Sequence, residues 1–408
     1  MNDWLCGRLL STKNKAGSDP VENGSAKAER PVWRFDNPVK ILFGAGALDD
    51  VAGIIGGRRY CLVTYDEPYF KTLSQRVAKG AGPPTVVIDT IRPNPDFATL
   101  SEQCARFAEL VTRDCVILAL GGGSVIDAAK VFASAGRGFE PVRRFLETKR
   151  GESALSAFPI IAVPTTAGTG SEVTSWATVW DTKGQQKYSL ARPEIYPSHA
   201  VIDPALMLGM SRDLTISTGL DALSHALESI WNRNANAVST NHAVFAASEL
   251  IATLPRLVDD LTNASLRDRV ARAALFAGLA FSNTKTALAH SVSYPITLKY
   301  GIPHGLACSF SLPMVMASVL GADEDCDHSL QRIFGDDLDA GVDRLENFLV
   351  NLGVSTDPGD YGLEGEEWRA LIDAALAGQR GQNFIGSHTR VMQCFVSRGS
   401  ESGLQSAL

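Results

Sequence analysis

The sequence lacks the features that mark secreted, membrane-spanning and nucleic-acid-binding proteins. Its seven cysteines are an odd number and include no Cys-x-x-Cys pair, so we expect free thiols in a cytosolic (cytoplasmic) protein. No apolar run reaches the length of a transmembrane helix, and the first residues lack the continuous apolar core of a secretory signal. The net charge of −7 gives no reason to expect a nucleic acid or a membrane as partner, and a negatively charged substrate would need a local basic patch.

What remains is an ordinary globular composition, 45% hydrophobic and 20% charged, over 408 residues. This length is sufficient for two domains, each with a core of its own. We expect an α/β nucleotide-binding domain over residues 31–208 and an all-helical domain over residues 209–396. Residues 1–30 are dominated by small and polar residues, and we expect flexible tails there and over residues 397–408.

Short apolar segments alternate with helical patterns in the first half of the chain. The predicted strands are residues 39–43, 60–64, 85–88, 115–120 and 160–163. Apolar strands that alternate with helices are typical of a parallel sheet covered on both faces. After about Pro204, Ala and Leu recur at helical spacing and strand patterns become rare, which predicts the helical domain.

A glycine-rich turn follows the clearest of these strands. Gly121-Gly122-Gly123-Ser124 stands between the strand 115–120 and a predicted helix, and the backbone N–H groups of a helix N-terminus can bind phosphate. The alternative is a tight turn without a ligand. A second loop, Pro164–Glu172, is rich in Thr, Ser and Gly and also follows a strand. Two such loops favour a dinucleotide over a single phosphate group.

Four residues in the second half form a candidate metal site. Asp221 and His225 are four residues apart in a helical pattern, which puts both side chains on one face. His290 lies in another helical pattern, and His304 follows a proline, as a residue entering a new helix does. One carboxylate and three imidazoles suit Fe(II), Zn(II), Co(II) or Mn(II). An Asp–His pair alone is common by chance, but buried polar groups need partners, and one shared cation serves all four.

Several segments together resemble the iron-containing (group III) alcohol dehydrogenase family. They occur in order between residues 39 and 315: Phe43–Leu48, Gly121–Ser124, Pro164–Glu172, Val201–Pro204, Gly219–Glu228 and Pro303–Gly305. The resemblance implies a dehydroquinate-synthase-like fold with an α/β nucleotide domain and an all-α domain. It also implies metal ligation by Asp221, His225, His290 and His304.

The resemblance assigns NAD(P) binding to residues of the first domain. These candidates are Asp66, Asn94, Gly122, Gly123, Ser124, Asp127, Thr165, Thr166, Thr169 and Lys187. Lys187 follows a turn on a predicted strand, where a solvated lysine is the alternative interpretation. The family often has Asp directly after the second strand, but here Tyr65 holds that place and Asp66 comes one residue later, so NADH and NADPH both stay open.

Two further departures from the family pattern concern the substrate. Tyr294 stands where the family usually has a histidine near the nicotinamide, and it is either a proton donor or a packing residue. Before His290 the family has small residues, whereas this chain has Thr284, Lys285 and Thr286. Thr286 is expected to share the helix face of His290. Lys285 must reach around the helix or precede it.

Hydroxyl groups and an ammonium group suit a phosphonate, although a solvated lysine is the alternative. The segment through Pro295 resembles the phosphonoacetaldehyde reductase branch of the family. We therefore expect a metal-dependent, NAD(P)H-linked reductase of a small anionic aldehyde, with Fe(II) or Zn(II) as the metal. The best candidate substrate is phosphonoacetaldehyde, which would give 2-hydroxyethylphosphonate. The expected assembly is a homodimer or larger.

Three alternatives stay open at this point. The first is a general short-chain alcohol dehydrogenase of the same family, and the second is a lyase on the dehydroquinate-synthase scaffold. The third is a non-enzymatic sensor, which would have no use for an open metal coordination position. Residues beyond about 320 carry no chemistry that the sequence predicts, and Gly381–Gly386 is expected to be a simple turn.

Overall fold

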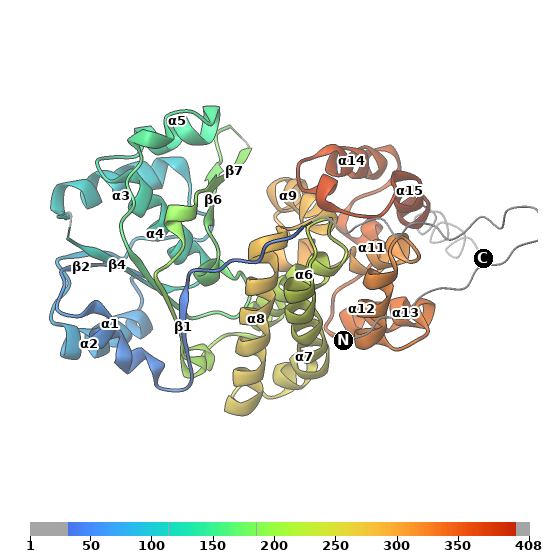
Figure 1. Cartoon of the computed structure of the whole chain (residues 1–408), viewed down its shortest axis with the longest axis horizontal. Helices are drawn as coiled ribbons and strands as arrows, with labels where there is room; N and C mark the ends of the chain where they lie inside the picture. Colours follow the sequence, from blue (N-terminus) through green and yellow to red (C-terminus); the bar gives the residue numbers. More distant parts are fainter. Residues whose placement is uncertain (1–31, 113, 185, 397–408) are drawn as a thin grey trace, which may run out of the picture. The chain divides into compact units, whose positions relative to one another are not determined.

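The computed structural model describes residues 32–112, 114–184 and 186–396, and from Arg34 onward its elements form one unit (Figure 1). The predicted flexible tails, residues 1–30 and 397–408, lie outside the described residues. No helix of the described segments is long and apolar enough to cross a bilayer. The thiols of Cys61, Cys104, Cys115, Cys308 and Cys326 are free and buried.

A six-stranded, fully parallel sheet forms the first half. Its spatial order is β1 (Lys40–Phe43), β8 (His199–Ile202), β5 (Ile160–Pro164), β4 (Val116–Gly121), β2 (Tyr60–Val63) and β3 (Val86–Ile88). Every residue of β4 and β5 is buried, which is why these strands are apolar without interruption. The predicted parallel sheet is therefore confirmed.

Alternate residues of the strands bury their side chains against helices on opposite faces. Leu62 and Leu118 pack with α1 (Val51–Ile55) and α2 (Pro68–Ala81). Ile117 and Ala119 pack on the other face, with the helices α3 (Phe97–Leu110), α4 (Gly123–Ala135) and α5 (Glu140–Thr148). Figure 1 shows the two helix groups on the two sides of the sheet.

An antiparallel hairpin of β6 (Trp176–Asp181) and β7 (Gln186–Ala191) follows β5. The α/β half ends with β8, and a short 3-10 turn at Pro204–Met207 leads to the helices. Because β8 ends at Ile202 and α6 begins at Arg212, a division near residue 208 stays our proposal for the domain boundary.

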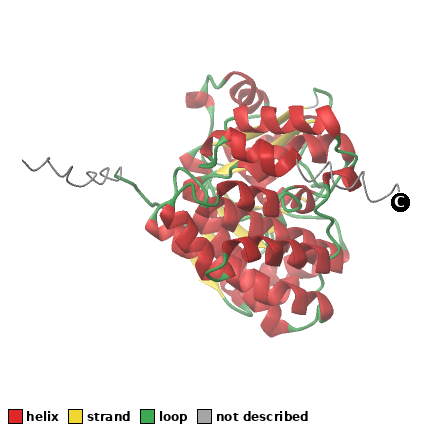
Figure 2. Cartoon of the chain, turned by 90° about the vertical axis from the view of Figure 1, so that its right-hand side faces the viewer, coloured by secondary structure: helices red, strands yellow, loops and turns green. Residues whose placement is uncertain are grey.

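Helices make up the second half, as predicted. Figure 2, which turns the right-hand side of Figure 1 toward the viewer, shows these helices covering that side. Its first two long helices begin at side-chain caps: Ser211 accepts a hydrogen bond from the N–H of Leu214, and Asn236 forms a capping box with Ser239. The helices are α6 (Arg212–Ile230), α7 (Ala237–Asp259), α8 (Ala264–Thr284), α9 (Leu288–Tyr300), α10 (His304–Ala307), α11 (Leu312–Val319), α12 (Glu324–Phe334), α13 (Leu338–Asn351), α14 (Gly365–Ala377) and α15 (His388–Val396).

Candidate metal and dinucleotide site

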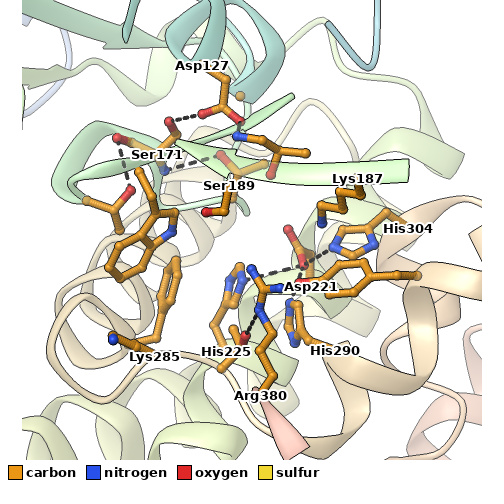
Figure 3. A pocket seen from close by; sticks show the side chains of 18 of the residues that line it. Asp127, Ser171, Lys187, Ser189, Asp221, His225, Lys285, His290, His304 and Arg380 are labelled. Carbon is orange, nitrogen blue, oxygen red and sulfur yellow. Dashed lines mark hydrogen bonds and ion pairs between the residues drawn. The ribbon is translucent and has the colours of Figure 1, made fainter. Parts of the chain in front are cut away.

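A cavity of about 480 Å³ lies at the carboxyl ends of the sheet strands, the usual ligand position of such sheets. The loops after β3, β4 and β5 form one wall together with the β6–β7 hairpin, and α6, α8, α9 and α10 form the other. Figure 3 shows Asp127, Ser171 and Ser189 on one side, and Asp221 with its histidines on the other. One cavity therefore contains both candidate sites.

The predicted metal ligands come together in this cavity. Asp221 and His225 lie on α6, His290 lies in the first turn of α9, and His304 begins α10. The Oδ1 atom of Asp221 lies 3.7 Å from Nε2 of His225, 3.4 Å from Nε2 of His290 and 3.9 Å from Nε2 of His304. Three helices thus present one carboxylate and three imidazoles to one point.

Glu228 fixes the ring of His290. Its carboxylate accepts hydrogen bonds from Nδ1 of that ring (2.6 Å) and from the backbone N–H (3.2 Å). Because Nδ1 carries the proton, Nε2 of His290 is an acceptor, and this buried atom has no hydrogen-bond partner among the described residues. A buried acceptor turned toward a carboxylate needs a positive charge between the two, and a divalent cation supplies it.

Three of the four pKa shifts at this cluster have the direction that metal binding requires. Burial would raise the pKa of Asp221, but the surrounding histidines outweigh burial and hold it below the usual range. Burial lowers the pKa of His225 to about 4 and that of His304 well below its usual value. Burial would also lower the pKa of His290, but Glu228 and Asp221 outweigh it and raise the pKa. An ionised carboxylate and neutral imidazoles are the forms that ligate metals, so the shifts of Asp221, His225 and His304 fit a divalent cation, and at His290 the cation would compete with a proton.

A thiol that sequence reasoning did not single out also lies in the cluster. Cys308 Sγ is 3.6 Å from Oδ1 of Asp221, and Asp221, His290, His304 and Cys308 have ligand atoms within 4.8 Å of one another. Burial raises the pKa of this thiol well above its ordinary value. The sequence feature that could have identified Cys308 is its position four residues after His304, one helical turn away.

The N-terminus of α4 forms the opposite end of the cavity. Gly122 is the N-cap, no side chain caps the helix, and the first two helical residues, Gly123 and Ser124, line the cavity. A Cβ on Gly123 would lie 2.6 Å from Cγ2 of Thr169, which explains why the position needs glycine. The backbone N–H of Asn94, a residue with φ of 58°, donates to Oγ of Ser124 (3.3 Å). An uncapped helix N-terminus beside hydroxyl groups fits a dinucleotide phosphate.

The predicted cofactor residues divide into two groups by position. On the cavity wall are Asn94, Gly123, Ser124, Asp127, Thr169 and Lys187. Outside it are Gly122, Thr165, Thr166 and Asp66, whose carboxylate pairs with Lys71 at the surface. The carboxylate of Asp127 accepts hydrogen bonds from Oγ of Ser171 (2.6 Å) and the N–H of Thr178 (2.8 Å), so part of its role is to hold the cavity wall.

The structure also separates the three candidate substrate residues. Thr286 lines the cavity but precedes α9, which begins at Leu288, so the expectation that it shares a helix face with His290 is wrong. Lys285 ends α8 with φ of 63° and is exposed at the end of the cavity away from Lys187 and His304 (Figure 3). Thr284 is fully buried, bonds to Oγ of Ser229 and does not line the cavity.

Arg380 is the main residue of the cavity that the sequence did not reveal. Its Nε donates to Oγ1 of Thr286 (2.9 Å), and its guanidinium carbon lies 4.7 Å from the ring centroid of Tyr294. The turn expected at 381–386 is present as a 3-10 turn over Gly381–Asn383, and Gln379 and Asn383 of the same segment also line the cavity. No local pattern marks Arg380, because only the packing of the last helices brings it here.

Tyr294 lies between the metal cluster and these basic residues. Its ring stacks on that of His304, with centroids 5.7 Å apart, and the Nζ atom of Lys187 lies 3.4 Å from its centroid. Burial raises the pKa of Tyr294 to about 12 and lowers that of Lys187 well below its usual value. The tyrosine hydroxyl therefore keeps its proton at neutral pH.

Sequence comparisons decide the family. The model of iron-containing alcohol dehydrogenase matches residues 38–204, and that of the C-terminal part of the same family matches residues 215–393. The chain belongs to the iron-containing alcohol dehydrogenase family. Both halves of the fold and the cavity between them are thereby accounted for by one family.

Individual members of this alcohol dehydrogenase family resemble the chain to different extents. A phosphonoacetaldehyde reductase of Streptomyces viridochromogenes is 36% identical over 240 residues, which is 56% of this chain and only 58% of that protein. An NAD-dependent methanol dehydrogenase of Bacillus methanolicus is 29% identical over 364 residues, 84% of this chain and 93% of that protein. The crystal structure of a sulfoacetaldehyde reductase of Bifidobacterium kashiwanohense in complex with NAD+ has a TM-score of 0.83 at 28% identity, covering 91% of this chain and 100% of that one.

As a member of this family, the chain is an NAD-linked oxidoreductase that acts on alcohols or aldehydes. The family, together with the NAD+ complex of the sulfoacetaldehyde reductase, implies NAD and a divalent metal as cofactors. The unpartnered Nε2 of His290 and the uncapped N-terminus of α4 fit these two groups.

Proposed function

We propose that this enzyme reduces a small aldehyde that carries a phosphonate or a similar anionic group, with phosphonoacetaldehyde as the best candidate and 2-hydroxyethylphosphonate as the product. The observation that carries the proposal is a pair of basic side chains, Lys285 and Arg380, on the wall of the cavity that contains the metal cluster. The acidic residues of that wall, Asp127 and Asp221, have partners of their own. An anionic substrate would supply the missing negative charge.

The relatives support this substrate class. Among them are a phosphonoacetaldehyde reductase and a sulfoacetaldehyde reductase, whose named substrates are two-carbon aldehydes with a tetrahedral anionic group. The methanol dehydrogenase is the counterexample, since its named substrate has no charge. A general short-chain alcohol dehydrogenase is therefore the function against which the proposal is tested.

In the proposed reaction Asp221, His225, His290 and His304 hold the divalent metal, while Gly123, Ser124 and Thr169 hold the dinucleotide. When bound, the dinucleotide supplies a hydride to the carbonyl carbon and the metal polarises the carbonyl oxygen. The alcohol oxygen takes one proton, and Tyr294 is the candidate donor because its hydroxyl stays protonated.

The test compares three aldehydes on enzyme loaded with Fe(II) or Zn(II). The decay of NADH absorbance is followed with phosphonoacetaldehyde, with sulfoacetaldehyde and with uncharged propanal, and is repeated with NADPH. A hydrogen-bonded charge pair contributes about 1.5–3 kcal/mol, so we expect kcat/KM for phosphonoacetaldehyde to exceed that for propanal by roughly 10- to 100-fold. Equal values for both aldehydes would replace the proposal with a general alcohol dehydrogenase.

A further inference from the structure

The turn that follows α14 differs from the other walls of the cavity, because it brings a guanidinium group to it. Arg380 precedes the 3-10 turn η7 (Gly381–Asn383). A Cβ on Gly381 would lie 2.0 Å from the carbonyl oxygen of Ala375, so the turn packs directly against the backbone of α14. Asn383 donates from Nδ2 to the carbonyl oxygen of Thr286 (2.9 Å). The backbone that follows Arg380 is thus held in place.

The side chain of Arg380 is held as firmly as its backbone. Its Nε donates to the hydroxyl of Thr286, and its guanidinium lies over the ring of Tyr294 at 4.7 Å. With Nε used, the two terminal nitrogens remain for a ligand, and no carboxylate of the described residues pairs with them. Two parallel N–H donors are the arrangement that binds an oxyanion in bidentate fashion.

The guanidinium of Arg380 and the metal cluster share a neighbour on the cavity wall. Tyr294 is the common neighbour: its ring lies 4.7 Å from the Arg380 carbon and 5.7 Å from the centroid of His304. Arg380 and His304 therefore both lie against Tyr294, and all three residues line the same cavity. A small aldehyde whose anionic group is close to its carbonyl carbon is the kind of molecule that these two neighbours of one ring could hold together.

We infer that Arg380, oriented by Thr286 and Tyr294, is the residue that binds the tetrahedral oxyanion of the substrate and so determines specificity. This inference rests on the proposed function and refines it, because the sequence pointed to Lys285 instead. Lys285 is exposed and lies at the far end of the cavity from His304 (Figure 3). Arg380 is half-buried and its guanidinium is already oriented, so little side-chain entropy is lost on binding.

The experiment measures the ratio of kcat/KM for phosphonoacetaldehyde to that for propanal in a set of variants. We expect Arg380→Ala to lower the ratio roughly 30- to 100-fold, because a charge-assisted bidentate contact is lost. Arg380→Lys keeps the charge without the planar fork and should restore only part of the ratio. Lys285→Ala should lower it far less. Arg369→Ala is the matched control, because this arginine lies on α14 and pairs at the surface with Glu366.

A second measurement separates this inference from the proposed function. Ethylphosphonate, a probe without an aldehyde, is titrated as an inhibitor of propanal reduction, and we expect its inhibition constant to rise at least 30-fold in Arg380→Ala. The wild type could show no preference for phosphonoacetaldehyde while Arg380→Ala weakens inhibition by ethylphosphonate. That result would refute phosphonoacetaldehyde as the substrate and would keep Arg380 as an anion-binding residue. Preference in the wild type that survives Arg380→Ala, or that is lost in Lys285→Ala, would overturn the role of Arg380. NADH binding and the circular dichroism spectrum are measured for each variant, and a variant that lacks both wild-type signals has not folded.

Discussion

Glu228 accepts hydrogen bonds from both the ring and the backbone of His290, which makes it the residue that orients one metal ligand from behind. Replacing it by glutamine keeps the size and one acceptor oxygen but removes the negative charge. We expect Glu228→Gln to lower the affinity for the metal by roughly 10- to 100-fold, as is usual for carboxylates behind a ligating histidine. Metal content after dialysis against graded chelator concentrations measures the change.

The control for this prediction is Glu249→Gln, which removes a carboxylate that pairs with Arg269 away from the cavity. It should leave the metal affinity unchanged. An unaltered affinity in Glu228→Gln as well would mean that the hydrogen bond alone, without its charge, is sufficient to orient His290.

The N-terminus of α4 is the element on which the dinucleotide site depends. In Gly123→Ala the new Cβ would meet Thr169 at 2.6–3.0 Å, so Thr169 must shift on the cavity wall. Overpacking of this kind costs about 1–3 kcal/mol, and we expect the Kd for NADH to rise roughly tenfold. Titration of NADH fluorescence measures it.

Gly53→Ala is the matched control, because a Cβ on this helical glycine of α1 would meet nothing within 4 Å. It should bind NADH as the wild type does. If Gly123→Ala also bound NADH with unchanged affinity, the phosphates would have to lie elsewhere on the cavity wall.

The short turn η3 (Ser171–Val173) contains a buried carboxyl group that makes stability depend on pH. Burial raises the pKa of Glu172 to about 7, against the lowering effects of its own backbone N–H and of Lys130. The folded protein thus binds this proton more tightly than the unfolded chain, and stability falls as pH rises from about 4.5 to 7. Glutamine does not titrate. Glu172→Gln should therefore remove a decrease in the free energy of unfolding on the order of 3 kcal/mol between those pH values.

Thermal unfolding at pH 5.5 and pH 8 tests this prediction. The difference in Tm between the two pH values should be smaller in Glu172→Gln than in the wild type. Glu249→Gln is the control, since the side-chain hydrogen bond from Arg269 lowers the pKa of Glu249 and its contribution is constant over this range. An identical pH dependence in Glu172→Gln and wild type would contradict the assignment.

For the molecule as a whole, the sequence predicted what depends on local pattern. Strands β4 and β5 are uninterrupted apolar runs because both faces of a parallel sheet are covered, and Asp221 and His225 share a face because they are one helical turn apart. The sequence did not predict Arg380 or Glu228. These residues act through contacts with segments 62 or more positions away, and no spacing in a single sequence reveals such pairs.

Thr286 illustrates a third case, in which the sequence indicated the right residue for the wrong reason. It was expected on the helix of His290, yet it lies in the connection before α9 and reaches the cavity because Asn383 and Arg380 bond to it. Helix boundaries are the least predictable part of an element, so an argument from a shared helix face fails where the helix begins two residues later.

The arrangement of the two sites predicts that metal and dinucleotide stabilise the fold separately. The candidate metal ligands all lie on α6, α9 and α10, whereas Gly123 and Thr169 belong to the α/β half. A ligand at 100 times its Kd stabilises the folded state by about 2.7 kcal/mol, so each should raise the Tm by several degrees. His290→Ala should lose the shift caused by metal and keep that caused by NADH, whereas Gly123→Ala should keep the metal shift and show a smaller NADH shift. Loss of both Tm shifts in either variant would contradict this prediction. It would mean that metal and NADH bind only together, because the shared cavity couples their binding.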